Sequence, residues 1–140
     1  MGTRSLTNLY TENGKELLVT IYRQFDGYPE GHGKQLQEII NNRRVVNGFS
    51  DKDREKKSFN GAGCLAAQLI HELKDDIGNI YINTPTPEFV CAEGFMDIEY
   101  GYKLYPRDGI VWMEIYDLHG KKPKQLFSGY IKAFGKKDTD

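Results

Sequence analysis

Residues 3–25 read TRSLTNLYTENGKELLVTIYRQF, and a turn signal lies at the centre of this stretch. The tripeptide Glu12-Asn13-Gly14 separates two runs, Thr3–Tyr10 and Lys15–Phe25. Asn-Gly is the strongest short-range hairpin signal, because both residues tolerate positive φ. The sequence therefore predicts a β-hairpin here.

The second run of this hairpin has a clear alternation of side chains. Leu17, Val19, Ile21, Arg23 and Phe25 fall on one face of a strand, because successive side chains point to opposite faces. Four of the five are apolar, so this face is expected to be buried. The alternation thus predicts that the Arg23 guanidinium lies on the core side of the sheet.

Two helices are predicted after the hairpin. A turn-rich loop at 26–33 leads into the first, Lys34–Asn42, which has apolar residues at helical spacing. The polar, charged segment 47–58 is interpreted as a solvated loop. A second helix opens at Asn60-Gly61-Ala62-Gly63 and runs to Ile77, where Gly78 ends it. Its predicted core stripe comprises Leu65, Ala66, Leu69, Ile70, Leu73 and Ile77.

The remaining sequence has strand patterns. An Asp108-Gly109 turn separates two of them, and the predicted strands are Ile80–Asn83, Met96–Leu104, Ile110–Asp117 and Leu126–Phe134. Strands on both sides of a helical middle are typical of the α+β class. We expect one domain over residues 1–140, with an antiparallel sheet packed against two α-helices.

Composition narrows the classes of function without naming one. The net charge is −1 over 140 residues, so a stable nucleic-acid complex is not expected. We find no apolar run of membrane-spanning length and no signal-peptide pattern. Two cysteines, Cys64 and Cys91, make neither a disulfide framework nor a zinc set, which favours a cytoplasmic protein. No cofactor and no metal are expected.

Arg23 is the most informative single residue. An unpaired guanidinium on a core face costs several kcal/mol, so Arg23 needs a partner or a cleft. One interpretation is a local salt bridge to Asp26 that fixes the turn. The other is an anion pocket, which arginine suits through its bidentate donor fork.

Two helix starts flanked by glycine favour the anion pocket. They are Gly31-His32-Gly33-Lys34 and Asn60-Gly61-Ala62-Gly63. A helix N-terminus offers free N–H groups and partial positive charge, and glycine lets a ligand approach the backbone. If both starts face Arg23, the three together make a phosphate-sized site, with Tyr28 beside it to pack on a base or ribose. The alternative is that these glycines serve turns and close packing.

The sequence offers few candidates for catalytic residues. Gly61-Ala62-Gly63-Cys64-Leu65-Ala66 matches a dinucleotide fingerprint, but a charged loop precedes it instead of a strand. Cys64 is interpreted as buried. His32, between two glycines, is the one histidine in a site-like setting; it is expected to be neutral because the helix dipole opposes a positive ring. A neutral His32 suits hydrogen bonding to a ligand, and a charged one suits general acid catalysis.

Three stretches carry a resemblance to a known family. MGTRSLT at 1–7, YRQFDGYPEGHG at 22–33 and NGAGCLAA at 60–67 resemble a family of small phage-encoded proteins. The resemblance covers roughly the first 75 residues. Small phage proteins of this size include sponges that sequester host immune nucleotides, such as the Sequestin and Lockin groups acting on ADP-ribose signals of Thoeris defence. Others cleave the cyclic dinucleotides of CBASS defence.

The leading hypothesis is therefore an antidefence sponge in the cytoplasm of the infected cell. It binds a phosphate-containing nucleotide signal without cleaving it, and uses no membrane. The expected contacts are Arg23, Asp26, Tyr28, Gly31, His32, Gly33, Lys34, Asn60, Gly61 and Gly63. An enzyme that cleaves a cyclic nucleotide is one alternative. A module that binds a host protein through its tyrosine-rich strands is another, and a homo-oligomer is left open.

Overall fold

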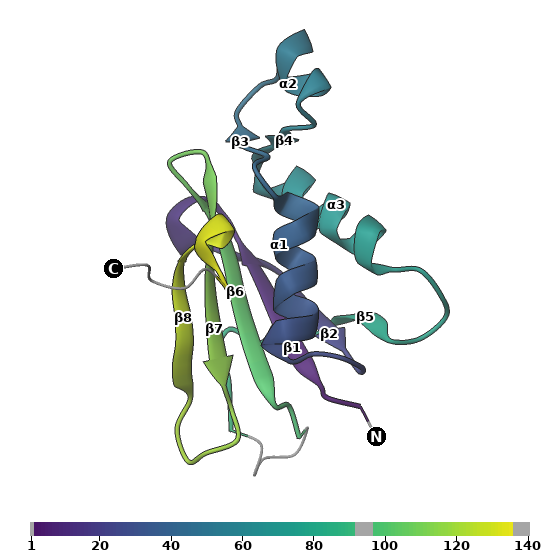
Figure 1. Ribbon diagram of the computed structural model, residues 1–140, viewed down its shortest axis with the longest axis vertical. Coiled ribbons are helices and arrows are strands. Elements are labelled where there is room, and N and C mark those ends of the chain that lie inside the picture. Colours follow the sequence, from purple (N-terminus) through teal and green to yellow (C-terminus); the bar gives the residue numbers. More distant parts are fainter. Residues whose placement is uncertain (1, 92–96, 136–140) are drawn as a thin grey trace.

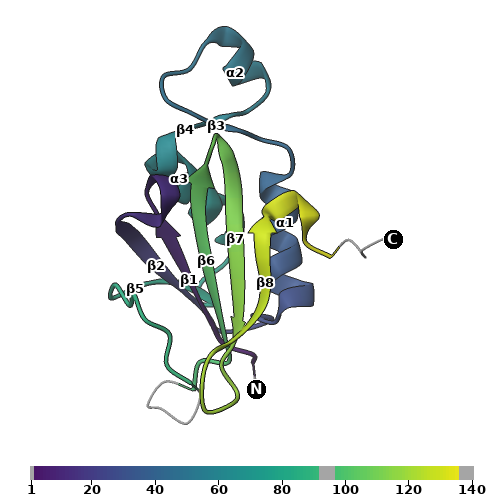
Figure 2. The same ribbon diagram turned by 90° about the vertical axis from the view of Figure 1, so that its left-hand side faces the viewer.

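The computed structural model describes residues 2–91 and 97–135. A six-stranded sheet in the order β5-β2-β1-β6-β7-β8 lies at its centre. The helices α1 (Lys34–Ile40) and α3 (Gly61–Leu73) pack on one face of this sheet, seen edge-on in Figure 1 and face-on in Figure 2. The strands are β1 (Ser5–Tyr10), β2 (Leu17–Arg23), β5 (Ile80–Asn83), β6 (Tyr100–Arg107), β7 (Ile110–Asp117) and β8 (Lys124–Tyr130). The predicted α+β class is confirmed.

The predicted hairpin is confirmed. β1 and β2 are antiparallel, with Ser5 opposite Arg23 and Leu9 opposite Val19. A short 3-10 turn joins them, in which Asn13 and Gly14 have φ of 58° and 75°. The register places Arg23 beside Ser5 at one end of the sheet, here the Arg23 end. The opposite end, here the Gly109 end, carries this hairpin turn and the Asp108-Gly109 turn between β6 and β7.

One main core fills the space between the sheet and the two helices. Apolar side chains from the helix-facing side of the central strands meet the apolar stripes of both helices. Burial of such side chains contributes about 1.5–3 kcal/mol each. The largest fully buried members are Leu9, Ile21, Leu36, Ile40, Phe59, Leu65, Leu69, Tyr102, Leu104, Met113 and Ile115.

The expectation of a purely antiparallel sheet is wrong, because β1 and β6 are parallel, with Ser5 beside Tyr100 and Leu9 beside Leu104. β5 rises from the Arg23 end along the free edge of β2, with Ile80 opposite Arg23 and Asn83 opposite Thr20. The chain must then return to the Arg23 end before β6 begins. β6 therefore runs in the same direction as β1.

The return segment after β5 covers part of the sheet face opposite the helices. Thr86 is bound there by two buried polar residues: Asn8 Nδ2 donates to its carbonyl at 2.8 Å, and its N–H donates to Thr20 Oγ1 at 3.0 Å. Further along, Ile98 joins Leu6 and Leu118 in a second, smaller core. Both faces of the central strands are thus buried near the Arg23 end.

The second helix is shorter than predicted. α3 ends at Leu73, and Lys74 leaves the helix with ψ of 100°. Lys74 Nζ donates to the carbonyls of Gly78 and Ile80, which ties the loop to the start of β5. Ile77, predicted in the core stripe, is 94% exposed. The helix stops early because the chain must reach the edge of β2.

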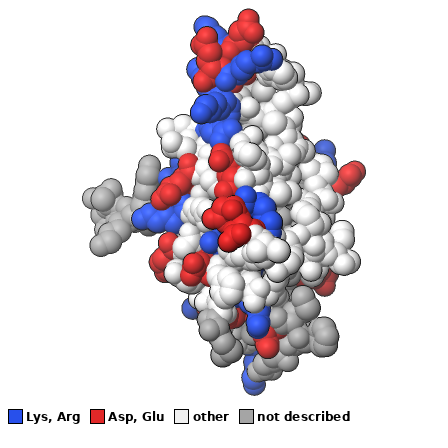
Figure 3. Space-filling view, turned by 90° about the vertical axis from the view of Figure 1, so that its right-hand side faces the viewer, with Lys and Arg blue, Asp and Glu red and all other residues white. Residues whose placement is uncertain are grey.

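The charged segment predicted as a solvated loop forms an arm that projects from the body at the Gly109 end (Figure 2). Its base is a two-residue parallel pairing of β3 (Val45–Val46) with β4 (Phe59–Asn60). Its tip is α2 (Asp51–Glu55), whose N-cap Ser50 forms a capping box with Asp53. Figure 3 shows acidic and basic side chains interleaved over this arm.

Other predicted boundaries differ by a few residues. Pro29–Gly33, expected in the turn-rich loop, is a turn of π-helix that leads into α1. β6 begins at Tyr100, and the predicted strand start at Met96 lies outside the described residues. β8 ends at Tyr130 and is followed by a 3-10 turn, Ile131–Ala133. Within the described ranges, no helix has the length and apolar character needed to cross a bilayer.

Candidate anion-binding site

Arg23 lies where the alternation predicted, on the helix side of the sheet, and it is only 8% exposed. Its Nη1 donates to Gln35 Oε1 at 2.6 Å and to His32 Nδ1 at 3.0 Å, and its Nε donates to the Phe25 carbonyl. Burial lowers the Arg23 pKa, and the nearby Asp26 charge opposes that shift. Three acceptors therefore hold the guanidinium in place.

The salt bridge considered between Arg23 and Asp26 does not form. Within the described part of the chain, every ion pair involves His119. Asp26 is exposed and adopts a left-handed φ of 61°. Its part in the turn is conformational, since aspartate is one of the few residues that tolerates this region.

His32 is fully buried, and both of its ring nitrogens are occupied. Arginine has no acceptor, so Nδ1 accepts from Arg23, and Nε2 carries the proton that it donates to Thr7 Oγ1 at 2.7 Å. Burial, and then the Arg23 charge, lowers the pKa of His32 to about 3. The ring is neutral, as expected, but for these reasons and not because of the helix dipole. In this state His32 cannot act as a general acid near neutral pH.

The glycines of the first helix start serve close packing. A Cβ on Gly31 would lie 2.8 Å from the Asp26 carbonyl, and one on Gly33 would lie 3.2 Å from the Phe134 ring. The N–H groups of Gly31 and His32 both donate to the Tyr28 carbonyl. Lys34 and Tyr28 are exposed, but the backbone donors beside them are already used within the turn.

The second helix start lies at the other end of the sheet. Gly61 and Gly63 line a cavity of about 650 Å³ together with Thr11 and Leu18 of the hairpin, at the Gly109 end. A Cβ on either glycine would meet nothing within 4 Å, so this start is open. The Asn60 side chain turns away from the helix and accepts from the Gly48 N–H at 2.8 Å. The structure therefore does not bring the three predicted parts of the anion site together.

A different cavity combines several cationic side chains. It measures about 230 Å³ and lies at the Gly109 end, between the end of α1, the start of β7 and the turn after β8. We call it the basic cavity. Its lining residues are Ile40, Asn41, Asn42, Arg43, Arg44, Ile110, Val111, Ile131 and Lys132.

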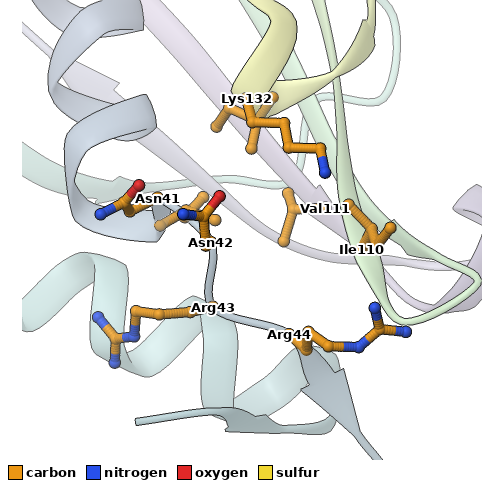
Figure 4. Close-up of a pocket in the computed structure, with 9 residues that line it drawn as sticks. Asn41, Asn42, Arg43, Arg44, Ile110, Val111 and Lys132 are labelled. Atoms are coloured by element: carbon orange, nitrogen blue, oxygen red, sulfur yellow. The ribbon is translucent and has the colours of Figure 1, made fainter. Parts of the chain in front are cut away.

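The end of α1 shapes this cavity. Asn41 leaves the helix with φ of 48° and ψ of −123°, outside the left-handed helical region usual for a cap, and its N–H donates to the Gln37 carbonyl. Arg43 turns back to the helix, where its Nη1 donates to the Ile39 carbonyl at 3.1 Å and its guanidinium stacks 4.2 Å from the centre of the Phe59 ring. Figure 4 shows Arg43 pointing away from the cavity. Its charge offsets the negative end of α1.

Two cations remain for a ligand. Figure 4 shows the Lys132 side chain and the Asn42 amide directed toward the open space, with Arg44 at its lower edge. Arg44 Nη2 makes one long contact, 3.4 Å, to the Asp108 carbonyl. Lys132 and Arg44 are exposed and have no ion-pair partner within the described ranges. The basic cavity thus carries positive charge, two amides and an aliphatic wall, and none of the lining residues within 2–91 and 97–135 is acidic.

Sequence reasoning missed this cavity. Asn41-Asn42-Arg43-Arg44 is a contiguous polar signal at the end of a predicted helix, and it could have been noticed. Lys132 and Val111 could not, because only the tertiary fold brings them to the end of α1. Cys64, interpreted as buried, is exposed.

His119 stands in contrast to His32. Its Nδ1 lies 2.7 Å from Asp117 Oδ1 and its Nε2 lies 3.0 Å from Glu99 Oε1. The hydrogen bonds that its ring donates to the two carboxylates, the one to Glu99 first, raise the pKa of His119. Within the part of the chain that is described, no group of three or more His, Cys, Asp or Glu side chains could hold a metal ion.

Comparison of the chain with protein-family models, with curated proteins and with solved structures gives no match. Function is therefore inferred from the residues of this chain.

Proposed function

We propose that this protein captures a phosphate-containing nucleotide in the basic cavity and releases it unchanged. The observation that carries the proposal is the pairing of Lys132 with Arg44 around a cavity to which the described part of the chain contributes no carboxylate. In a chain of net charge −1, such a local excess of positive charge favours an anion. Arginine binds a phosphate with its planar fork and lysine binds it as a point charge.

The rest of the lining suits the sugar of a nucleotide. Asn41 and Asn42 offer amide donors and acceptors for hydroxyl groups, and the aliphatic wall includes Val111 and Ile131. The volume of about 230 Å³ is below the roughly 300–1,000 Å³ of a pocket that encloses a drug-sized molecule. The cavity therefore holds the phosphate and ribose, and the base lies at its rim.

Capture is favoured over cleavage by the same lining. Among the described residues, it contains no histidine, cysteine or carboxylate that could transfer a proton or attack phosphorus near neutral pH. His32, the candidate acid, is neutral and buried, with both ring nitrogens engaged. The resemblance to small phage proteins supplies the setting: a sponge that withdraws an immune nucleotide, of the ADP-ribose or cyclic oligonucleotide type, in the cytoplasm of an infected cell.

Calorimetric titration with ADP-ribose, a cyclic dinucleotide and adenosine tests the proposal. At least one phosphate-bearing ligand should bind, and adenosine should not. Lys132→Ala and Arg44→Ala should each weaken binding by about 1.5–3 kcal/mol, roughly ten- to a hundredfold. Lys122→Ala, an exposed lysine in the β7–β8 loop, is the matched control and should bind as the wild type does.

The fate of the ligand distinguishes a sponge from an enzyme. After incubation and heat denaturation, chromatography should recover the nucleotide intact. A cleaved product, or equal affinity of the wild type and Lys132→Ala, would contradict the proposal.

A further inference from the structure

A row of four aromatic rings crosses the sheet on the face opposite the helices. Tyr105 pairs with Trp112, and Trp112 pairs with Tyr130. Tyr10 follows Leu9, whose partner Leu104 precedes Tyr105, so Tyr10 lies next in line. With strands about 4.8 Å apart, the row spans about 14 Å. We call Tyr10, Tyr105, Trp112 and Tyr130 the aromatic row.

Most of the aromatic row lies beyond the part of this face that the segment after β5 buries; at its near end, the Tyr10 hydroxyl donates to the Pro87 carbonyl of that segment at 3.5 Å. All four rings are partly exposed. A cavity of about 230 Å³ opens beside Tyr10 and Tyr105, bounded by Lys103 and Glu114. The row is therefore accessible, with room beside it for a planar group.

Cations accompany the rings. The Arg107 guanidinium lies 4.4 Å from the centre of the Trp112 ring, and Lys103 Nζ lies 5.4 Å from that of Tyr116. The one carboxylate among these strand residues, Glu114, accepts hydrogen bonds from the hydroxyls of Tyr105 and Tyr116. These hydroxyls are neutral and leave Glu114 charged, so Lys103 and Arg107 together exceed its charge by one positive unit.

Trp112 also has a donor without an acceptor. Its Nε1 is buried and has no hydrogen-bond partner in the described part of the chain. The ring packs edge-on against Tyr130, with centroids 5.1 Å apart, beneath the Arg107 guanidinium. Because Arg107 covers the Trp112 ring, a base stacks on this ring only where Arg107 moves aside.

We propose that the aromatic row binds a short stretch of single-stranded nucleic acid, with two or three bases stacked on its rings and phosphates on Arg107 and Lys103. Exposed sheet faces with aromatic side chains on adjacent strands stack bases in this way, because every base has a π-face. The net charge of −1 argues against binding through phosphate neutralisation alone. Stacking supplies the affinity here. The inference does not depend on the basic cavity.

Trp112 is the single tryptophan of the chain, so its fluorescence reports directly on the row. Titration of the full chain with a short oligothymidylate, and with an oligouridylate of equal length, should quench this emission. The slope of log affinity against log salt should be about −1.4, because two cations meet a single strand. The outcome shows whether DNA or RNA is preferred.

Variants locate the contact. Tyr130→Leu should weaken binding about tenfold, measured by the anisotropy of a labelled oligonucleotide. Arg107→Gln should weaken it several-fold without affecting the fold, because Arg107 is exposed. Arg54→Gln is the matched control: Arg54 also stacks on an aromatic ring, that of Phe49, but on the arm. It should bind as the wild type does.

Three results would overturn the proposal. The first is that neither oligonucleotide binds or alters Trp112 emission. The second is that duplex DNA binds as tightly as the single strand. The third is that a proline-rich peptide quenches Trp112 while the oligonucleotides do not, which would assign the row to a polypeptide partner.

Discussion

The two ends of the sheet hold positive charge in opposite ways. At the Arg23 end, the guanidinium is buried and bound by His32, Gln35 and the Phe25 carbonyl. At the Gly109 end, Lys132 and Arg44 are exposed around an open cavity. A charge whose hydrogen bonds are made within the protein stabilises the fold. A charge that still faces solvent is available to a ligand. The first end therefore has a structural role, and the second is the end that we propose for ligand binding.

The largest expected effect is on stability, from Arg23→Ala. The substitution leaves the buried His32 Nδ1 without a donor and removes the partner of the half-buried Gln35 Oε1, which should lower the free energy of unfolding by about 3 kcal/mol. Urea denaturation measures it. Arg54→Ala, on the exposed arm, should change stability by less than about 0.5 kcal/mol. If Arg23→Ala is as stable as the wild type, Arg23 does not stabilise the fold.

The next prediction concerns the pH dependence of stability, which depends on His32 at the Arg23 end. The pKa of His32 is about 3 in the folded protein and about 6.5 when unfolded, so the unfolded state binds more protons between these values. Stability should therefore fall as the pH drops below about 6.5, by up to about 1.4 kcal/mol per pH unit from this residue. The wild type minus His32→Gln difference isolates the slope. A His32 ring that titrates near pH 6.5 by NMR would contradict the buried, neutral state.

At the Gly109 end, we expect the substitution Gly109→Ala to have a smaller effect on stability. Gly109 has φ of 75°, and a Cβ there would lie 2.9 Å from Arg44 Nη2. We expect a loss of about 1 kcal/mol in stability and weaker nucleotide binding, because Arg44 must move. Gly48→Ala is the matched control: its φ is 83°, but a Cβ there would meet nothing within 4 Å. The control should lose similar stability and keep its affinity. Equal affinities for all three proteins would show that Arg44 does not contact the ligand.

The smallest expected effect concerns His119, whose pKa is raised by Glu99 and Asp117. Its contribution is present below the unfolded pKa of about 6.5 and is lost as the pH rises through the folded value, opposite in sign to that of His32. Since the side chain is about half exposed, solvent screens the effect. An NMR titration should place its pKa above 6.5, and Glu99→Gln should lower it. A wild-type pKa of His119 at or below 6.5 would contradict its hydrogen bonds to Glu99 and Asp117.

Local patterns predicted much of the fold. Residues close in sequence predict the Asn13-Gly14 turn, both helices, the Asp108-Gly109 turn and the burial of Ile21 and Arg23 on one face of β2. Phe25, predicted on that same buried face, follows the end of β2 and is 47% exposed. The parallel pairing of β1 with β6 does not, because it depends on the path of the segment after β5 across the far face. The end of α3 was missed for a similar reason: Ile77 fits a helical stripe, but β5 must reach the edge of β2.

Less of the candidate site could be predicted from the sequence. Strand alternation placed Arg23 on the core side, but its partners His32 and Gln35 come from the turn and helix that fold over it. The basic cavity joins Asn42 and Arg44 to Lys132, about ninety residues later in the chain. No local pattern links them, because tertiary packing alone creates their proximity.

One titration tests the division between the two ends most directly. Calorimetry with ADP-ribose compares Arg23→Lys with Lys132→Ala, both below their unfolding temperatures. Arg23→Lys should be less stable, because the lysine cannot reproduce the forked contacts, yet it should bind with wild-type affinity. Lys132→Ala should be as stable as the wild type and bind about ten- to a hundredfold more weakly. Weakened binding in Arg23→Lys with undiminished binding in Lys132→Ala would contradict this account and place the ligand at the Arg23 end.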